Sequence, residues 1–149
     1  MKLFVALLSF LCLVQLSTAQ KKNLPIKVIE ATLLKWVSGA PGGRTGTKYT
    51  IKVYIHTNKK VEFKNIWIGK ENAPFDVEFF SLDIPKKIQQ GDSLLLTYNT
   101  INGERIENSE SKGVPICYKG SALFETAIDG KTRYFIVKNF RKLPPLRGQ

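Results

Sequence analysis

Short runs in which apolar and polar residues alternate constrain the fold of this 149-residue chain more than any other feature. Tyr49–Ile55 alternates throughout, and Phe75–Phe79 repeats the pattern with acidic residues between its apolar ones. A period of two is typical of a half-buried β-strand, whereas no window of about 11 residues shows the 3.6-residue period of an amphipathic helix. The sequence therefore predicts an all-β protein, with a turn around Pro85–Gln90 as its sole helical candidate.

Strand signals of this kind recur along the chain. The predicted strands are Ile26–Val37, Tyr49–Ile55, Val61–Ile68, Phe75–Phe79, Leu94–Tyr98, Val114–Tyr118, Ala122–Ile128 and Arg133–Phe140. A loop is expected over Gly39–Gly46, and a tight turn at Asn102-Gly103 falls in a polar connection, Asn99–Gly113, that we expect to be mobile. Short strands at this spacing predict a single antiparallel β-sandwich of immunoglobulin-like topology, with a small β-barrel as the alternative.

The dipeptide Asp129-Gly130 lies between two of these segments and is typical of a two-residue β-hairpin loop. With a loop of that length, Phe124 falls opposite Phe135, and the pair would contribute to a core face. Nearer the loop, the same face carries Thr126 and Arg133. These polar residues lead us to expect a solvated hairpin tip.

The inward positions of the strands define the predicted core. In Val61–Ile68 the apolar phase slips after Phe63, which a period of two allows only with an extra residue, so we expect a β-bulge near Lys64-Asn65. The predicted core residues are Ile51, Val53, Ile55, Phe63, Trp67, Val77, Phe79, Leu94, Leu96, Phe124, Phe135 and Val137.

Residues 1–19 have the pattern of a signal peptide. Met1-Lys2 is a short positive start, Leu3–Leu16 is mostly apolar, and Ser17-Thr18-Ala19 supplies the small side chains of a cleavage site. The apolar run has about 14 residues, whereas a membrane-spanning helix needs roughly 20. We therefore expect an exported protein, periplasmic or extracellular, with one mature domain over 20–149. It should have no transmembrane segment and a flexible tail from about Leu143.

Cysteine and histidine are too scarce after residue 19 for the common metal and disulfide sites. That part of the chain contains one Cys, one His and no Met. This composition excludes an intrachain disulfide, Cys/His zinc sites and Met-ligated copper, and we expect no cofactor. Cys117 lies between Ile116 and Tyr118, which favours a small buried hydrophobe. His56 follows a strand and precedes a polar turn, so we expect it to be exposed.

No motif indicates catalysis. A glycosidase needs two carboxylates on either side of a cleft, but Asp76, Glu78 and Asp83 lie in or beside one predicted strand. Gly39–Gly46 is followed by a strand and lacks the Lys-Ser/Thr pair of a phosphate-binding loop. We therefore expect a protein that is not an enzyme. The alternative is a glycan-directed hydrolase that uses these carboxylates or Glu125.

The chain is strongly basic. It has 23 Lys plus Arg against 12 Asp plus Glu, and only Lys2 falls within residues 1–19, so the net charge of +11 becomes +10 without that segment. A surplus of this size attracts polyanions. If it forms a working surface, the basic residues of separate turns should gather at an end of the sandwich. The candidate anion-contacting residues are Arg44, Lys59, Lys60, Lys86, Lys87 and Arg141.

The two tryptophans have different surroundings. Trp67 has isoleucine on both sides, which favours the core. Trp36 borders the glycine-rich loop and is either a core residue or an exposed platform on which a sugar or base could stack.

One stretch resembles a known group of proteins. The pattern comprises Ala31-Thr32, Trp36, the glycine-rich loop Gly39–Gly46, Tyr49-Thr50-Ile51 and Ile66-Trp67-Ile68-Gly69. Over residues 29–79 it resembles small uncharacterised exported β-sandwich proteins of Bacteroidota, which carry a signal peptide. The resemblance implies a bacterial envelope setting and assigns no activity to any residue.

These observations lead us to expect an exported, non-catalytic binding or scaffolding module of the bacterial envelope. The expected partner is anionic, such as an acidic glycan, lipopolysaccharide or extracellular nucleic acid, or else another envelope protein. A subunit of a larger envelope assembly is a further alternative, which an exposed strand edge or apolar patch would favour.

Overall fold

The structure is a computed structural model that describes residues 24–40, 42–79, 87–102, 104–105 and 112–147. The predicted signal peptide lies outside the described residues. The strands are β1 (Ile26–Val37), β2 (Thr45–Ile55), β3 (Val61–Ile68), β4 (Glu71–Ala73), β5 (Asp76–Phe79), β6 (Ser93–Ile101), β7 (Glu104–Arg105), β8 (Ala122–Ile128), β9 (Lys131–Val137), β10 (Arg141–Lys142) and β11 (Leu146–Arg147). Within these ranges, no helix has the length and apolarity needed to cross a membrane.

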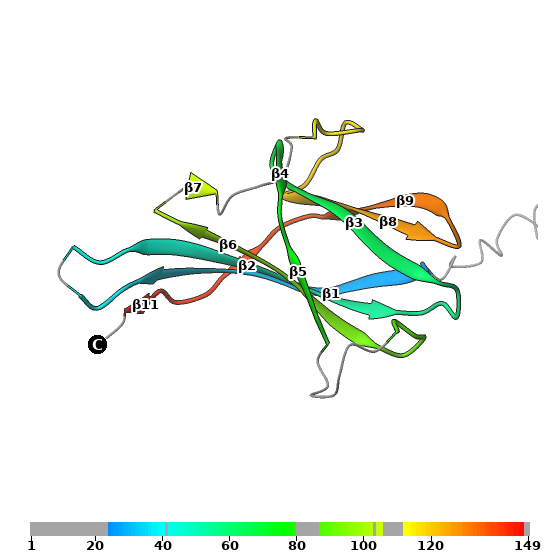
Figure 1. Cartoon of the computed structure of the whole chain (residues 1–149), viewed down its shortest axis with the longest axis horizontal. Coiled ribbons are helices and arrows are strands. Elements are labelled where there is room, and N and C mark those ends of the chain that lie inside the picture. The colour runs from blue at the N-terminus through cyan, green and yellow to red at the C-terminus, as the bar shows by residue number, and fades with distance from the viewer. Residues whose placement is uncertain (1–23, 41, 80–86, 103, 106–111, 148–149) are drawn as a thin grey trace, which may run out of the picture.

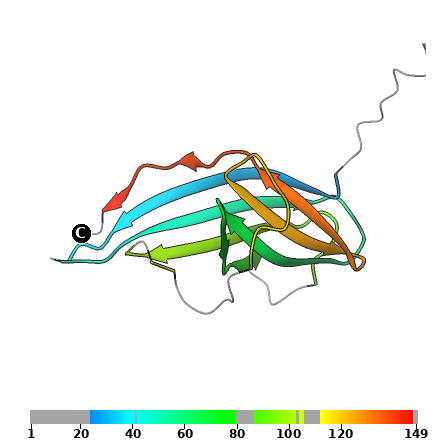
Figure 2. The same ribbon diagram turned by 90° about the horizontal axis from the view of Figure 1, so that it is seen from above.

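The strands form two sheets that pack together as a β-sandwich, as predicted (Figure 1). The first sheet has the order β10-β1-β2-β6-β5, with β11 also paired to β1 and β7 to β6. The second has the order β4-β3-β8-β9. Neighbouring strands are antiparallel, except that β10 and β11 run parallel to β1. Figure 2 shows this C-terminal segment running alongside β1.

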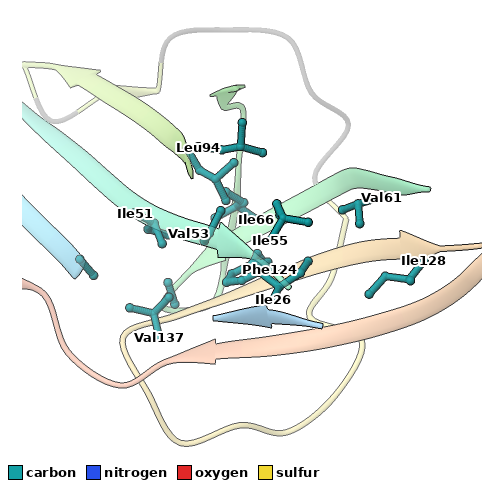
Figure 3. Packing of buried hydrophobic residues seen from close by; sticks show 13 residues of the cluster. Ile26, Ile51, Val53, Ile55, Val61, Ile66, Leu94, Phe124, Ile128 and Val137 are labelled. Atoms are coloured by element: carbon teal, nitrogen blue, oxygen red, sulfur yellow. The ribbon is translucent and has the colours of Figure 1, made fainter. Parts of the chain in front are cut away.

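The core lies between the sheets and is built from the inward residues of both (Figure 3). Val53 and Leu94 of the first sheet and Phe124 of the second have no exposed surface. The Phe124 ring stacks on Phe135, with 5.2 Å between the ring centroids. Burial of such a side chain stabilises the fold by about 1.5–3 kcal/mol, which is large against the net stability of a domain.

Two local predictions are confirmed. Phe124 pairs with Phe135 across the β8–β9 hairpin, whose loop residues Asp129 and Gly130 have φ angles of 48° and 76°. These left-handed conformations are those of a type I′ turn, which matches the twist of a hairpin. The register of β3 against β8 shifts between Phe63 and Asn65, so Lys64 is the bulge residue.

The predicted core is confirmed except at its rim. Val77 is 37% exposed, because the four-residue strand β5 is an edge strand that pairs only with β6 in the described residues. Phe63, Phe79 and Phe135 are partly buried and pack against the cluster. The expectation of a solvated hairpin tip is wrong at Thr126, which is fully buried, because β8 lies between β3 and β9. Its partner Arg133 lies on the edge strand and is exposed.

The predicted strand Val114–Tyr118 is absent, and these residues form bends and irregular chain. Pro115 lacks the amide that a strand ladder requires, which disfavours pairing here. As a result Cys117 is exposed, contrary to the expectation of a buried thiol. The Tyr118 hydroxyl still anchors the segment by donating a hydrogen bond to the Gly69 carbonyl. Partial burial raises the pKa of that tyrosine.

Three further expectations concern the connections. The chain over 87–90 shows no helix, and the rest of the predicted helical turn lies outside the described residues, as does Gly103. Part of the predicted polar connection Asn99–Gly113 is paired, since β6 continues to Ile101. The C-terminal segment, predicted to be flexible from about Leu143, pairs with β1, and the Leu143 amide donates to the Leu33 carbonyl over 2.9 Å.

Candidate functional site

Two turns that are distant in sequence meet at one end of the sandwich. The Lys60 amide donates a hydrogen bond to Oδ1 of Asp129 over 3.1 Å, and the Asp129 amide donates to the Lys60 carbonyl over 3.0 Å. The Lys59 ammonium lies 3.8 Å from Oδ2 of the same carboxylate. These contacts join the β2–β3 turn to the β8–β9 hairpin loop, both of which lie at the right-hand end of the molecule in Figure 1.

A third segment, the chain before β6, joins the same end. The Gly91 amide donates to the Ile55 carbonyl over 2.9 Å, and the Ile55 amide donates to the Asp92 carbonyl over 3.0 Å. The Gln89 amide donates to Oδ2 of Asp92 over 2.7 Å, which closes the turn. The β2–β3 turn and the chain before β6 line a hollow of about 390 Å³, called here the lysine hollow. Its lining residues are Asn58, Lys59, Lys60, Lys87, Ile88, Gln89 and Gln90.

The three lysines of this hollow differ in how far their charges are compensated. Lys60 forms an ion pair with Glu62, which raises the pKa of that lysine. Hydrogen bonds from Lys60 and then Lys64 lower the pKa of the Glu62 carboxyl to about 2. Lys59 faces Asp129, whereas no carboxylate of the described residues lies within ion-pair distance of Lys87. The hollow therefore keeps a positive surplus.

The structure brings together half of the predicted anion-contacting residues. Lys59, Lys60 and Lys87 line the lysine hollow. Arg44 lies in the β1–β2 loop at the opposite end of the sandwich, and Arg141 lies on β10, where it pairs with Glu30 (Figure 1). Lys86 lies outside the described residues. The fold therefore does not bring all six residues together on a single surface.

Trp36, predicted to be either a stacking platform or a core residue, is half-buried on β1. Its ring lies so close to Gly46 on β2 that a Cβ at that glycine would collide with it. Trp36 thus serves as packing between strands, which leaves less of its ring for a ligand. Trp67 is 2% exposed and donates from Nε1 to the Lys112 carbonyl over 2.9 Å, so its predicted place in the core is confirmed.

The described carboxylates of the hydrolase alternative are divided between the two sheets. Asp76 and Glu78 are exposed on the edge strand β5, and Glu78 accepts a hydrogen bond from the Thr97 hydroxyl over 3.3 Å. Glu125 lies on β8 in the other sheet and accepts from the Asn65 side chain. Asp83 lies outside the described residues. None of Asp76, Glu78 and Glu125 is among the lining residues of the lysine hollow.

His56, as predicted, is exposed, and its ring makes an edge contact with Tyr54 at 4.7 Å between centroids. Among the described residues, no three His, Cys, Asp or Glu side chains gather as a metal site would require.

A second hollow, which the sequence analysis missed, lies beside the first. It has a volume of about 580 Å³ and is called here the hairpin hollow. Its lining residues are Leu24, Pro25, Thr57, Lys59, Ile128, Asp129, Lys131, Arg133 and Phe135. The predicted hairpin already placed Lys131 and Arg133 beside its loop, and that signal could have found them. Their approach to the start of β1 depends on the packing of the two sheets.

A third hollow, of about 710 Å³, is more apolar. It lies between the Gly69-Lys70 turn and the irregular segment that carries Ile116 and Cys117.

Comparison of the chain with protein-family models, with curated proteins and with solved structures gives no match.

Proposed function

We propose that this protein is an exported, non-catalytic binding module of the bacterial envelope that contacts an anionic partner through the lysine hollow. The observation that carries the proposal is the convergence of Lys59, Lys60 and Lys87 around one concave surface. Export is supported by the signal-peptide pattern of residues 1–19. N-terminal sequencing of the protein recovered from the envelope or medium should begin at Gln20, and an intact Met1 would overturn export.

The lining of the lysine hollow suits a polar anion. Lysine provides a mobile, hydrated point charge rather than the fixed fork of arginine, so it favours flexible charged chains over one rigid phosphate geometry. The side-chain amides of Asn58, Gln89 and Gln90 add neutral hydrogen-bonding groups to the same surface. The net charge of +10 that remains without residues 1–19 supplies long-range attraction, and the hollow supplies the place of contact.

The experiment compares two triple variants of equal charge. One carries Lys59→Gln, Lys60→Gln and Lys87→Gln, and the control carries Arg44→Gln, Lys142→Gln and Arg147→Gln, all at exposed positions outside the hollow. Heparin serves as the polyanionic probe, with binding measured between about 50 and 200 mM salt. The first variant should bind at least about tenfold more weakly and lose about two to three units of the log–log salt slope.

The control variant should lose less than about threefold in heparin affinity, since its substitutions change only the long-range electrostatic field of the protein. Equal losses in the two variants would show that net charge alone attracts the probe, and the proposed site would then be abandoned. Thermal unfolding of both variants checks that neither loss reflects a damaged fold.

A further inference from the structure

The hairpin hollow differs in chemistry from the lysine hollow that it adjoins. Its apolar lining residues are Leu24 and Pro25, just before β1, together with Ile128 and Phe135 from the hairpin. Its cationic lining residues are Lys59, Lys131 and Arg133. Lys59 lines both hollows, so the two adjoin at this residue.

The apolar lining residues include one that is widely accessible to a ligand. Leu24 is 60% exposed, which leaves a large aliphatic side chain in contact with water at the wall of a concave site. One face of the half-buried Phe135 ring is taken by Phe124, at 5.2 Å between centroids. A sugar could therefore not stack on that face, whereas an alkyl chain needs only apolar contact. The volume of about 580 Å³ lies within the range of small-molecule sites.

The cationic lining residues favour an anionic head group. Within the described ranges, no carboxylate lies within ion-pair distance of Lys131 or Arg133, and Asp129 is already engaged by Lys59 and the Lys60 amide. Arginine can bind a phosphate or carboxylate with two parallel hydrogen bonds, which adds geometric selectivity to charge. A hollow lined by both cations and apolar side chains matches a molecule that has an anionic head and an alkyl chain.

We propose that the hairpin hollow binds a single-chain amphiphile, with its alkyl chain against Leu24, Pro25 and Phe135 and its anionic head on Lys131, Arg133 and Lys59. This inference rests on the proposed function, because it specifies the class of anion that the basic end of the sandwich receives. The apolar lining residues favour such a ligand over a purely polar polyanion, which has no group to contact them.

The test is an NMR titration of the amide signals of the purified protein. The probes are dodecyl phosphate below its micelle concentration, dodecyl maltoside as a neutral molecule of equal chain length, and inorganic phosphate as a head without a chain. Dodecyl phosphate should bind at least about tenfold more tightly than either control, because it alone can contact both the apolar and the cationic lining residues. The largest shifts should fall on Leu24, Lys59, Lys131 and Arg133.

Two matched variants locate the apolar contact. Leu24→Gln should weaken dodecyl phosphate binding at least about fivefold while heparin binding stays unchanged. Leu146→Gln, at a leucine that is 59% exposed at the opposite end, should change neither. Equal binding of phosphate or maltoside, shifts spread over the whole sandwich, or no effect of Leu24→Gln would overturn the inference. Failure of the proposed function would appear in a separate measurement, because heparin affinity would then be unchanged by the substitution of Lys59, Lys60 and Lys87.

Discussion

Lys60 and Asp129 are joined by two backbone-mediated hydrogen bonds, one from the Lys60 amide to Oδ1 of Asp129 and one from the Asp129 amide to the Lys60 carbonyl. The pair fixes the β2–β3 turn against the β8–β9 hairpin loop. Because Lys59 precedes one partner and Lys131 closely follows the other, this contact also sets the boundary between the lysine hollow and the hairpin hollow. One carboxylate thus acts on both the fold and the charge of the candidate site.

Substitutions at Asp129 should separate these two roles. Asp129→Ala should lower the free energy of unfolding by about 2 kcal/mol, because it removes the acceptor of the Lys60 amide and places alanine at a left-handed φ. Asp129→Asn should cost less than about 1 kcal/mol, since asparagine keeps an acceptor and tolerates that conformation. Urea unfolding measures both values.

The same pair of variants tests the charge. Asp129→Asn removes the negative group that faces Lys59, so heparin should bind about two- to fivefold more tightly than to the parent protein. Unchanged or weaker binding to a fully folded Asp129→Asn variant would argue against Lys59 as a contact.

Glu62 should make the stability of the protein weakly dependent on pH in the acidic range. Hydrogen bonds from Lys60 and Lys64 hold its pKa at about 2 in the folded state, below the ordinary value of 4.5. A carboxyl whose folded pKa is lowered contributes stability above its unfolded value, and the contribution is lost as the pH falls from 4.5 toward 2. The contribution should be small, because the group is exposed and screened by water.

Glu62→Gln should therefore have a slightly lower urea midpoint than the parent protein at pH 7, and the difference should disappear near pH 2. Salt at about 1 M should shrink the difference at pH 7 as well, because it screens exposed ion pairs. A difference that persists unchanged at pH 2 would show that the carboxylate acts through packing instead.

Gly46 should tolerate no side chain. A Cβ there would collide with the Thr100 carbonyl oxygen on β6 and with the Trp36 ring on β1. Gly46→Ala should lower the free energy of unfolding by about 1–3 kcal/mol, the usual effect of overpacking. Gly113→Ala is the matched control, since among the described residues no atom beyond its chain neighbours lies within 4 Å of a Cβ at that position, and it should change stability by less than about 0.5 kcal/mol. Equal effects on urea unfolding would contradict the close contact of Trp36 with Gly46.

Local features of the sequence were sufficient for the hairpin and the bulge. The dipeptide Asp129-Gly130 favours one turn type, and a two-residue loop leaves a single register, which the pairing of Phe124 with Phe135 confirms. The slip of apolar phase after Phe63 required an extra residue, and the register shift lies there. Both predictions depended on residues close together in the chain.

Burial at strand edges could not be predicted in the same way. Thr126 and Val77 each occupy an alternating pattern, but neighbouring strands decide how much of each is covered. Thr126 is buried because β8 is central, and Val77 is exposed because β5 is an edge strand. Strand order is a property of contacts distant in sequence, which local periodicity does not contain. The Val114–Tyr118 segment is different, because its own Pro115 disfavours the strand that its apolar residues predict.

The sequence by itself determined the all-β class, most of the core and the presence of a basic surplus. The alternation of apolar and polar residues and the turn residues act locally, and net charge is a sum over the chain, so none of them depends on tertiary contacts. Only the tertiary structure decided which basic residues meet. It brought Lys59, Lys60 and Lys87 around one hollow and set Arg44 and Arg141 apart from it. It also placed Leu24 beside the hairpin, because packing of the two sheets brings the start of β1 to the β8–β9 loop.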